Sequence, residues 1–334
     1  DGHLVVVSAD ARRCIDASPV APTLLDALER WTVVEPALHD LARTVNATAA
    51  PGAMPFDARQ CLAPLPRTWQ WLDGSAFLNH GHLMERAFKV PPVADFETIP
   101  LMYQGAADDF LGPHDDVALP SEADQIDFEG EFGVVLSETP MGVTAEEALQ
   151  HVRLIVLIND WSLRAFGPRE AKSGFGFVQA KPSTAFAPIA VTPDELGAAW
   201  NGGRVHLRLQ TQRNGEWFGH PHGGAMHFDF GQLIAHAART RRLSAGTLIG
   251  SGTVSNADVA VGSSCIAERR MVEALADGAP HTPFLRFGER VRMVALDEQG
   301  QPAPFGVIDQ MVVPGDAAGP GRVNTLDAIS SIAI

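Results

Sequence analysis

Two glutamates and one aspartate occupy positions at which their carboxylates could act together. Glu129 and Glu131 stand two residues apart in residues 126–136, where alternating apolar side chains are typical of a strand, so both carboxylates project from one face. Carboxylates held that close raise each other's pKa unless a cation lies between them, and such oxygen ligands suit Mg²⁺, Mn²⁺ or Ca²⁺. A solvent-facing strand edge is the alternative interpretation.

The third acid follows the next apolar run. Residues 154–158 contain only Leu, Ile and Val, and Asp160 comes two residues after them. The run is too short for a buried helix and suits a buried strand, which places Asp160 at the strand's end. Asp160 could also cap a following helical turn. We predict that Glu129, Glu131 and Asp160 bind one divalent cation.

A lysine and a tyrosine add to the candidates. Lys181 lies between Ala180 and Pro182 in a largely apolar stretch, and burial there would lower its pKa. A structural lysine whose amine reaches solvent is the alternative. Tyr103 is the single tyrosine of the chain, and either a placed phenol or a half-buried core side chain explains it.

Four motifs, in this order, resemble the fumarylacetoacetate hydrolase family. They are the Glu-x-Glu strand, the Asn-Asp-Trp-Ser-x-Arg block of residues 159–164, Lys181, and the Gly-Ser-Gly-Thr-Val-Ser loop of residues 250–255. The resemblance implies a homodimer in which a metal held by carboxylates chelates both oxygens of a β-diketo acid. As a Lewis acid, the metal would stabilise the enolate that leaves when the carbon–carbon bond breaks.

The resemblance also implies a role for each matching residue. The acids would hold the metal, Lys181 would steady the oxyanion or deliver a proton, and Glu268 would orient the attacking water. The substrate would be bound by four residues, Tyr103, Arg164, Gly252 and Thr253.

Two positions depart from the family pattern as we align it. A fourth acidic ligand would fall on Asn79, and the water-activating histidine, seven residues later, on Arg86. Because arginine cannot act as a base near neutral pH, a histidine of the His80-Gly81-His82 turn would replace it, and we assign His82 to the catalytic set. Otherwise the reaction is one that requires no activated water, a decarboxylation or a tautomerisation.

Composition narrows the classes of partner. A formal charge of −15 over 334 residues argues against nucleic acids and anionic membranes as partners, but not against a small anionic substrate. Apolar runs are too short to span a bilayer, and the N-terminus has no signal-peptide pattern. Three widely spaced cysteines fit reduced thiols. We expect a cytoplasmic protein.

The predicted fold is a mixed, β-dominated α+β fold. Residues 1–70 form an N-terminal accessory region, and residues 71–334 form a catalytic domain with the family's β-sandwich or roll. Apolar spacing predicts helices over residues 23–29, 35–45, 144–152 and 230–239, and Asn-Gly at 214–215 predicts a hairpin. Residues 265–267 are strand-like, which argues against a dinucleotide-binding loop at residues 250–252, because such a loop leads into a helix.

The leading hypothesis is a divalent-metal-dependent hydrolase that cleaves a carbon–carbon bond in a small diketo acid of the fumarylacetoacetate or acylpyruvate type, in aromatic-compound breakdown. One alternative is an oxaloacetate-type decarboxylase or keto-enol isomerase on the same scaffold. The other is a weakly active protein that retains the metal but has lost the base.

Overall fold

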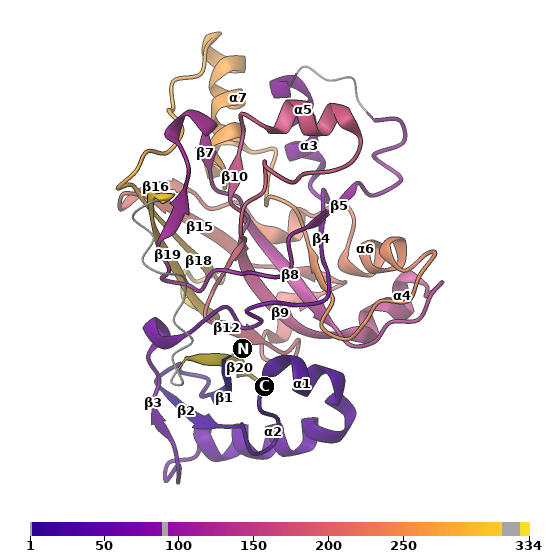
Figure 1. The fold of residues 1–334 in the computed structure, drawn as a ribbon, viewed down its shortest axis with the longest axis vertical. Helices are drawn as coiled ribbons and strands as arrows, with labels where there is room; N and C mark the ends of the chain where they lie inside the picture. The colour runs from indigo at the N-terminus through magenta and orange to yellow at the C-terminus, as the bar shows by residue number, and fades with distance from the viewer. Residues whose placement is uncertain (1, 89–92, 316–327) are drawn as a thin grey trace.

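A large β-sheet runs the length of the molecule (Figure 1). The computed structural model describes residues 2–88, 93–315 and 328–334. Within them, the sheet has eleven strands in the order β3-β2-β1-β20-β12-β9-β8-β17-β4-β5, with β11 beside β9. Their bounds are β1 His3–Val7, β2 Arg13–Asp16, β3 Met54–Pro55, β4 Trp71–Gly74, β5 Met102–Gly105, β8 Gly130–Leu136, β9 Val152–Asn159, β11 Ala185–Phe186, β12 Ile189–Val191, β17 Leu248–Gly250 and β20 Ile329–Ala333.

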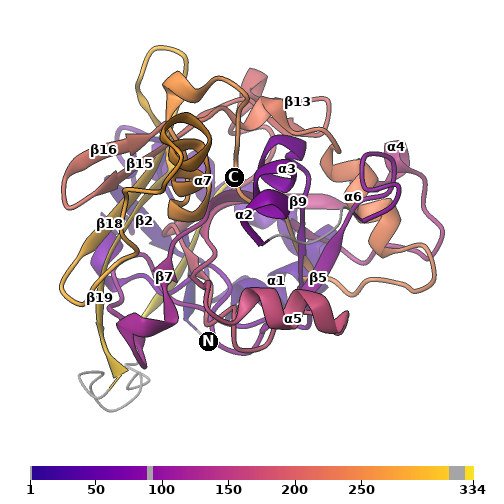
Figure 2. The same cartoon turned by 90° about the horizontal axis from the view of Figure 1, so that it is seen from above.

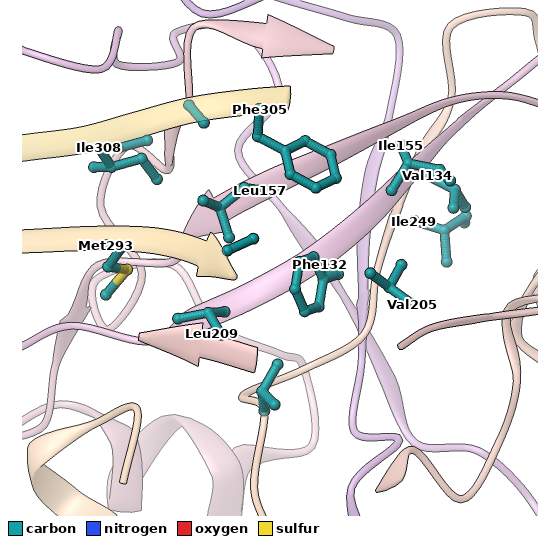
Figure 3. Close-up of a cluster of buried hydrophobic side chains, with 14 of the residues drawn as sticks. Phe132, Val134, Ile155, Leu157, Val205, Leu209, Ile249, Met293, Phe305 and Ile308 are labelled. Atoms are coloured by element: carbon teal, nitrogen blue, oxygen red, sulfur yellow. The ribbon is translucent and has the colours of Figure 1, made fainter. Parts of the chain in front are cut away.

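A second sheet packs against the middle of the first. It has the order β16-β15-β18-β19-β6. Phe132 and Leu157 of the large sheet meet Leu209, Met293 and Phe305 of the second in the main core (Figure 3). Its strands are β6 Val117–Leu119, β15 Arg208–Arg213, β16 Glu216–Gly219, β18 Arg290–Leu296 and β19 Pro302–Pro314, and two strand pairs stand apart, β7 Ile126–Asp127 with β10 Ser162–Leu163 and β13 Trp200–Asn201 with β14 Arg204–Val205.

The central strands are buried on both faces. Along β8, Phe132 and Val134 face the core between the sheets, whereas Val135 belongs to a second core under the N-terminal helices. This pattern follows from the two-residue period of a strand. Glu131, on the same strand, is therefore enclosed by apolar layers and is fully buried.

Helices gather at the two ends of the sheet. In Figure 1, α1 and α2 cover β1 and β2 at one end, while α3, α5 and α7 lie at the opposite end; Figure 2 views the molecule from above. No helix of the described residues is long and apolar enough to cross a membrane. The helices are α1 Leu24–Glu29, α2 Trp31–Asn46, α3 Leu78–Phe88, α4 Ala145–Ala148, α5 Gly167–Ser173, α6 Phe230–Ala237 and α7 Ile266–Asp277.

The predicted fold class is confirmed, with two local differences. The helix predicted over residues 144–152 has its capping box at Thr144 and Glu147, but α4 ends at Ala148 and β9 begins at Val152. The strand predicted at residues 265–267 is wrong, because α7 begins there. Its free N–H groups find acceptors in the Cys265 sulfur and a buried carboxylate, Asp127, and such capping stabilises a helix start.

The last strand joins the first. β20 lies between β1 and β12 and runs parallel to both. Residues 329–333, which the sequence-based boundary at residue 70 assigns to the catalytic domain, therefore complete the sheet that carries the N-terminal helices.

A glycine keeps the end of β17 close to β4. Gly252 has a φ of +75°, and a Cβ there would lie 2.2 Å from the carbonyl oxygen of Gly74. Gly142 has a similar φ of +79°, but no atom lies within 4 Å of the point that a Cβ would occupy. A side chain at Gly142 would therefore add backbone strain alone, whereas one at Gly252 would add both backbone strain and a steric clash.

We expect Gly142→Ala to cost about 1 kcal/mol, the strain of a left-handed backbone alone. Gly252→Ala should cost a further 1–3 kcal/mol or so, because β4 and β17 must also separate. Urea unfolding of the two variants measures the difference. Equal losses would contradict the proposed close approach.

Candidate active site

Three carboxylates converge where four neighbouring strands of the large sheet end. Asp73 lies on β4, Glu131 on β8, and Asp160 directly after β9. One oxygen from each lies within 4.8 Å of the others, and all three residues are buried. The group is arranged as a set of oxygen ligands around one point.

The charges of this group fit a divalent cation. Burial and the neighbouring Asp160 raise the pKa of Asp73 to about 8. Burial, Asp73 and Asp160 raise the pKa of Glu131 well above its ordinary value. Neither oxygen of Glu131 has a hydrogen-bond partner among the described residues. A buried carboxylate without a donor is costly, and hard oxygen donors of this kind suit Mg²⁺, Mn²⁺ or Ca²⁺.

Glu129, the predicted ligand that is missing from this group, contacts two cations instead. Its Oε1 lies 2.6 Å from Nη2 of Arg164, and its Oε2 accepts a hydrogen bond of 2.7 Å from Nζ of Lys181. Burial raises the pKa of Glu129, but Arg164 and Lys181 outweigh that effect and hold it well below its usual range. Glu129 is an ionised neighbour of the three converging acids.

Lys181 joins Glu129 to the acid group. Its Nζ also donates a hydrogen bond of 2.6 Å to Oδ2 of Asp160. Burial alone would lower the pKa of Lys181, as expected from its sequence context, but Asp160 and Glu129 raise it above its ordinary value. The side chain therefore stays a cation, which favours stabilisation of negative charge over proton delivery.

Tyr103 and Thr184 complete the surroundings of Asp160. The Tyr103 hydroxyl donates to Oδ2 at 2.6 Å, and the Thr184 hydroxyl donates to Oδ1 at 2.7 Å. Burial and Asp160 raise the pKa of Tyr103 well above its ordinary value. The single tyrosine is therefore a placed phenol that fixes the orientation of an acid.

Arg164 is oriented by a hydrogen bond to Asp127, which does not line the cavity. Its Nε donates to Oδ2 of Asp127 at 2.8 Å. Oδ1 and Oδ2 of Asp127 also accept the N–H groups of Ile266 and Ala267, the first two residues of α7, at 2.7 and 2.9 Å. Asp127, which no sequence pattern singled out, connects Arg164 to the helix that carries Glu268.

A cavity of about 300 Å³ opens beside these groups and is lined by Asp73, Glu129, Arg164 and Lys181 together with Thr253. Two of the lining side chains have buried donors with no hydrogen-bond acceptor, Nη2 of Arg164 and Oγ1 of Thr253. The short distance from this Arg164 nitrogen to Glu129 lacks hydrogen-bond geometry. Neither donor has an acceptor among the described residues, and an anionic or carbonyl-bearing ligand would supply one.

Gly252 supports the acid group through its backbone. Its N–H donates to Oδ1 of Asp73 at 3.0 Å, and the glycine itself lines the cavity. The cavity is lined by all four predicted substrate-binding residues, Tyr103, Arg164, Gly252 and Thr253.

Residues 80–82, predicted as a turn, lie in α3, and one of the two histidines faces the cavity. His80 lines it, and its Nδ1 lies 3.1 Å from Oε2 of the buried Glu268. With Glu268 ionised, Nδ1 carries the shared proton and Nε2 is left as an acceptor. His82, assigned to the catalytic set from the sequence, is instead 47% exposed, packs on Phe96 and is absent from the cavity lining, because it lies on another face of α3.

The resemblance implies a histidine seven residues after an acidic ligand. This spacing was counted from Asn79 in the sequence, but it fits Asp73 better. Asp73 is an acid, and His80 follows it by seven residues. Asn79 instead donates to Ser255 and Asn256, and Arg86 is exposed. Asp73 and His80 therefore stand at the spacing that was expected of Asn79 and Arg86, and both line the cavity.

Comparison with protein families gives two matches. The fumarylacetoacetate hydrolase C-terminal domain matches residues 70–313, and the fumarylacetoacetase N-terminal domain 2 matches residues 1–67. Among curated proteins, a 2,4-didehydro-3-deoxy-L-rhamnonate hydrolase of Sphingomonas sp. is 31% identical over 52% of this chain and 56% of its own length. The mitochondrial oxaloacetate tautomerase FAHD2B of Bos taurus is 25% identical over 75% of this chain and 76% of its own.

A solved structure shares the fold. The fumarylpyruvate hydrolase of Pseudomonas aeruginosa, solved in complex with Mn²⁺ and pyruvate, superposes with a TM-score of 0.52. The match covers 73% of this chain and 89% of the other at 16% sequence identity.

Metal binding should release protons, because the raised pKa values of Asp73 and Glu131 favour their protonated forms without a metal, and a bound cation would displace those protons. Affinity for Mg²⁺ or Mn²⁺ should therefore rise as the pH increases from 6 to 8. Calorimetric titration in two buffers of different ionisation enthalpy measures the number of protons released.

Asp73→Asn should release about one proton fewer and weaken metal binding at least about tenfold. Its metal-free form should melt no lower than wild type, because the amide resembles the protonated acid. Asp108→Asn, in an exposed loop, is the control. Unchanged metal affinity and proton release in Asp73→Asn would remove Asp73 from the ligand set.

Proposed function

Since the chain belongs to the fumarylacetoacetate hydrolase family, we propose that it is a divalent-metal-dependent hydrolase of a small β-diketo acid. The substrate class is the acylpyruvate or fumarylacetoacetate type, and the metal is Mg²⁺, Mn²⁺ or Ca²⁺. The proposal rests on one observation: His80, which pairs with Glu268, and Asp73, which belongs to the acid group with Glu131 and Asp160, line the same cavity.

The ligand set and the substrate contacts follow from the geometry. Asp73, Glu131 and Asp160 would hold the cation, which when bound supplies a Lewis acid for the two oxygens of the diketo acid. The free donors of Arg164 and Thr253 would receive the substrate's carboxylate. Lys181, a cation beside Asp160, would lie near the oxygen on which negative charge develops.

His80 supplies the base that hydrolysis requires. Its Nε2 takes a proton from water while the water oxygen bonds to the acyl carbonyl carbon, and Glu268 stabilises the resulting imidazolium. The bond between that carbon and the adjacent methylene then breaks, and its electron pair passes to the pyruvate half as an enolate. The proton is returned to the former methylene carbon, so an acylpyruvate gives a carboxylic acid and pyruvate.

Tautomerisation of oxaloacetate is a second candidate. The Bos taurus relative named for that activity aligns over three quarters of this chain, a larger share than the rhamnonate-derived hydrolase does. A tautomerase moves a proton between carbon and oxygen and needs no water attack. Spectroscopic assays on acylpyruvates and on oxaloacetate, with products resolved by chromatography, separate the two reactions.

His80→Gln should lower kcat for acylpyruvate hydrolysis at least about a hundredfold, because general-base assistance is lost. Metal affinity should stay unchanged, since His80 is not among the converging acids. His82→Gln, two residues away and exposed, is the matched control and should stay within about twofold of wild type. If both variants hydrolyse at the wild-type rate, His80 is excluded as the base, whereas tautomerisation becomes the leading function if the wild-type protein turns over oxaloacetate and hydrolyses no acylpyruvate.

Lys181→Met should lower turnover at least about a hundredfold, because a charge near the developing oxyanion is removed. Metal affinity should be equal or higher, because a cation that competes for Asp160 is gone. Lys172→Met, an exposed lysine of α5, is the control. Parallel loss of turnover and of metal binding would indicate a purely structural lysine.

A further inference from the structure

The cavity has two chemically different parts. Its polar part consists of Asp73, His80, Glu129, Arg164 and Lys181. The other part is built by the second half of α3, residues 93–102, α5 and the segment that follows it, and its side chains are mainly apolar: Met84, Val93, Phe96, Leu101, Met102 and Phe177.

We propose that the acyl group of the substrate is apolar and carries no second carboxylate. This inference rests on the proposed function, because it concerns the half of a diketo acid that lies beyond the reacting carbonyls. When the two oxygens of the diketo acid are held beside the metal ligands, the acyl half must point away from these ligands. The acyl half then lies in the apolar part of the cavity.

The cations of the described lining are already committed to acids. Arg164 lies beside Asp127 and Glu129 at 2.8 and 2.6 Å, and Lys181 beside Glu129 and Asp160 at 2.7 and 2.6 Å. In the polar part, the Thr253 hydroxyl and Nη2 of Arg164, which lies beside Glu129 but donates no hydrogen bond, are left for one carboxylate. A second carboxylate would find no cation of its own among these residues.

Among the described residues, the apolar part contains one charged side chain, and that side chain is an acid. Glu85 follows Met84 on α3 and lines the cavity with it. A carboxylate placed there would lose solvation against apolar walls and meet a like charge, and both effects are unfavourable. An alkyl or aryl group would instead bury apolar surface in contact with Met84 and Phe177.

A matched pair of substrates tests the inference. 2,4-Dioxooctanoate ends in a methyl group, whereas 2,4-dioxooctanedioate has a carboxylate at that end and is otherwise the same. With the metal-loaded enzyme, kcat/KM for the monoacid should exceed that for the diacid at least tenfold. A ratio near one, or a preference for the diacid, overturns the inference.

Three variants assign the preference to this part of the cavity. Glu85→Gln should raise kcat/KM for the diacid several-fold, because a repelling charge is removed. Leu101→Arg, at a side chain that is 36% exposed and can accept a charged group, should reverse the preference, whereas Leu101→Gln should not. Metal affinity should be the same in all three. If Leu101→Arg leaves the ratio unchanged, the tail does not lie in the apolar part and the inference fails.

Binding separates this inference from the proposed reaction. Calorimetry with 2-oxooctanoate and 2-oxooctanedioate compares the two tails without any bond cleavage. If no diketo acid is hydrolysed but the monoacid binds at least tenfold more tightly, the hydrolase proposal fails and the tail preference stands. Equal affinities, or no binding of either acid, overturn the tail preference.

Discussion

One fully buried carboxylate, Asp127, holds the parts of the site in register. It accepts the N–H of Phe128, the first two N–H groups of α7 and Nε of Arg164. Because α7 begins at this acceptor, the position of Glu268 in its first turn is set by strand β7, and His80 is set in turn by Glu268. A change at Asp127 would therefore move the base pair and the substrate-binding arginine together, although Asp127 does not line the cavity.

From Asp127 the charges alternate in sign through the interior. Asp127 pairs with Arg164, Arg164 with Glu129, Glu129 with Lys181 and Lys181 with Asp160. Burial of ionised groups is tolerated when each has a partner, but buried ion pairs contribute little net stability. Asp73 and Glu131 lie beyond the end of this series and have raised pKa values. The two acids without a cationic partner thus lie where a divalent cation would bind them, which is an arrangement expected of a functional site and not of a stabilising network.

Sequence patterns identified the parts of the site that depend on local structure. Glu131, Asp160 and Lys181 stand out because each lies in or directly beside a strongly apolar segment. Asp73 does not, because β4 has only four residues and meets the other acids through its pairing with β17, a strand that comes much later in the chain. The start of α7 was missed for a related reason, since the acceptor that stabilises its first turn comes from Asp127, far away in sequence. His80 could have been found, because its spacing from Asp73 matches the family pattern.

The two parts of the cavity also differ in how they are supported. The acids lie on β4 and β8 and directly after β9, and each of these strands has a neighbouring strand on both sides. Their side chains are almost completely buried. The apolar part comes from peripheral segments, where Val93 and Leu101 are 52% and 36% exposed. Groups that must hold reacting atoms need rigid support, whereas loops tolerate substitution. A chain built this way can keep its metal chemistry fixed while exchanging the side chains that contact the acyl group, so that substrate choice changes at the periphery without disturbing the buried charges.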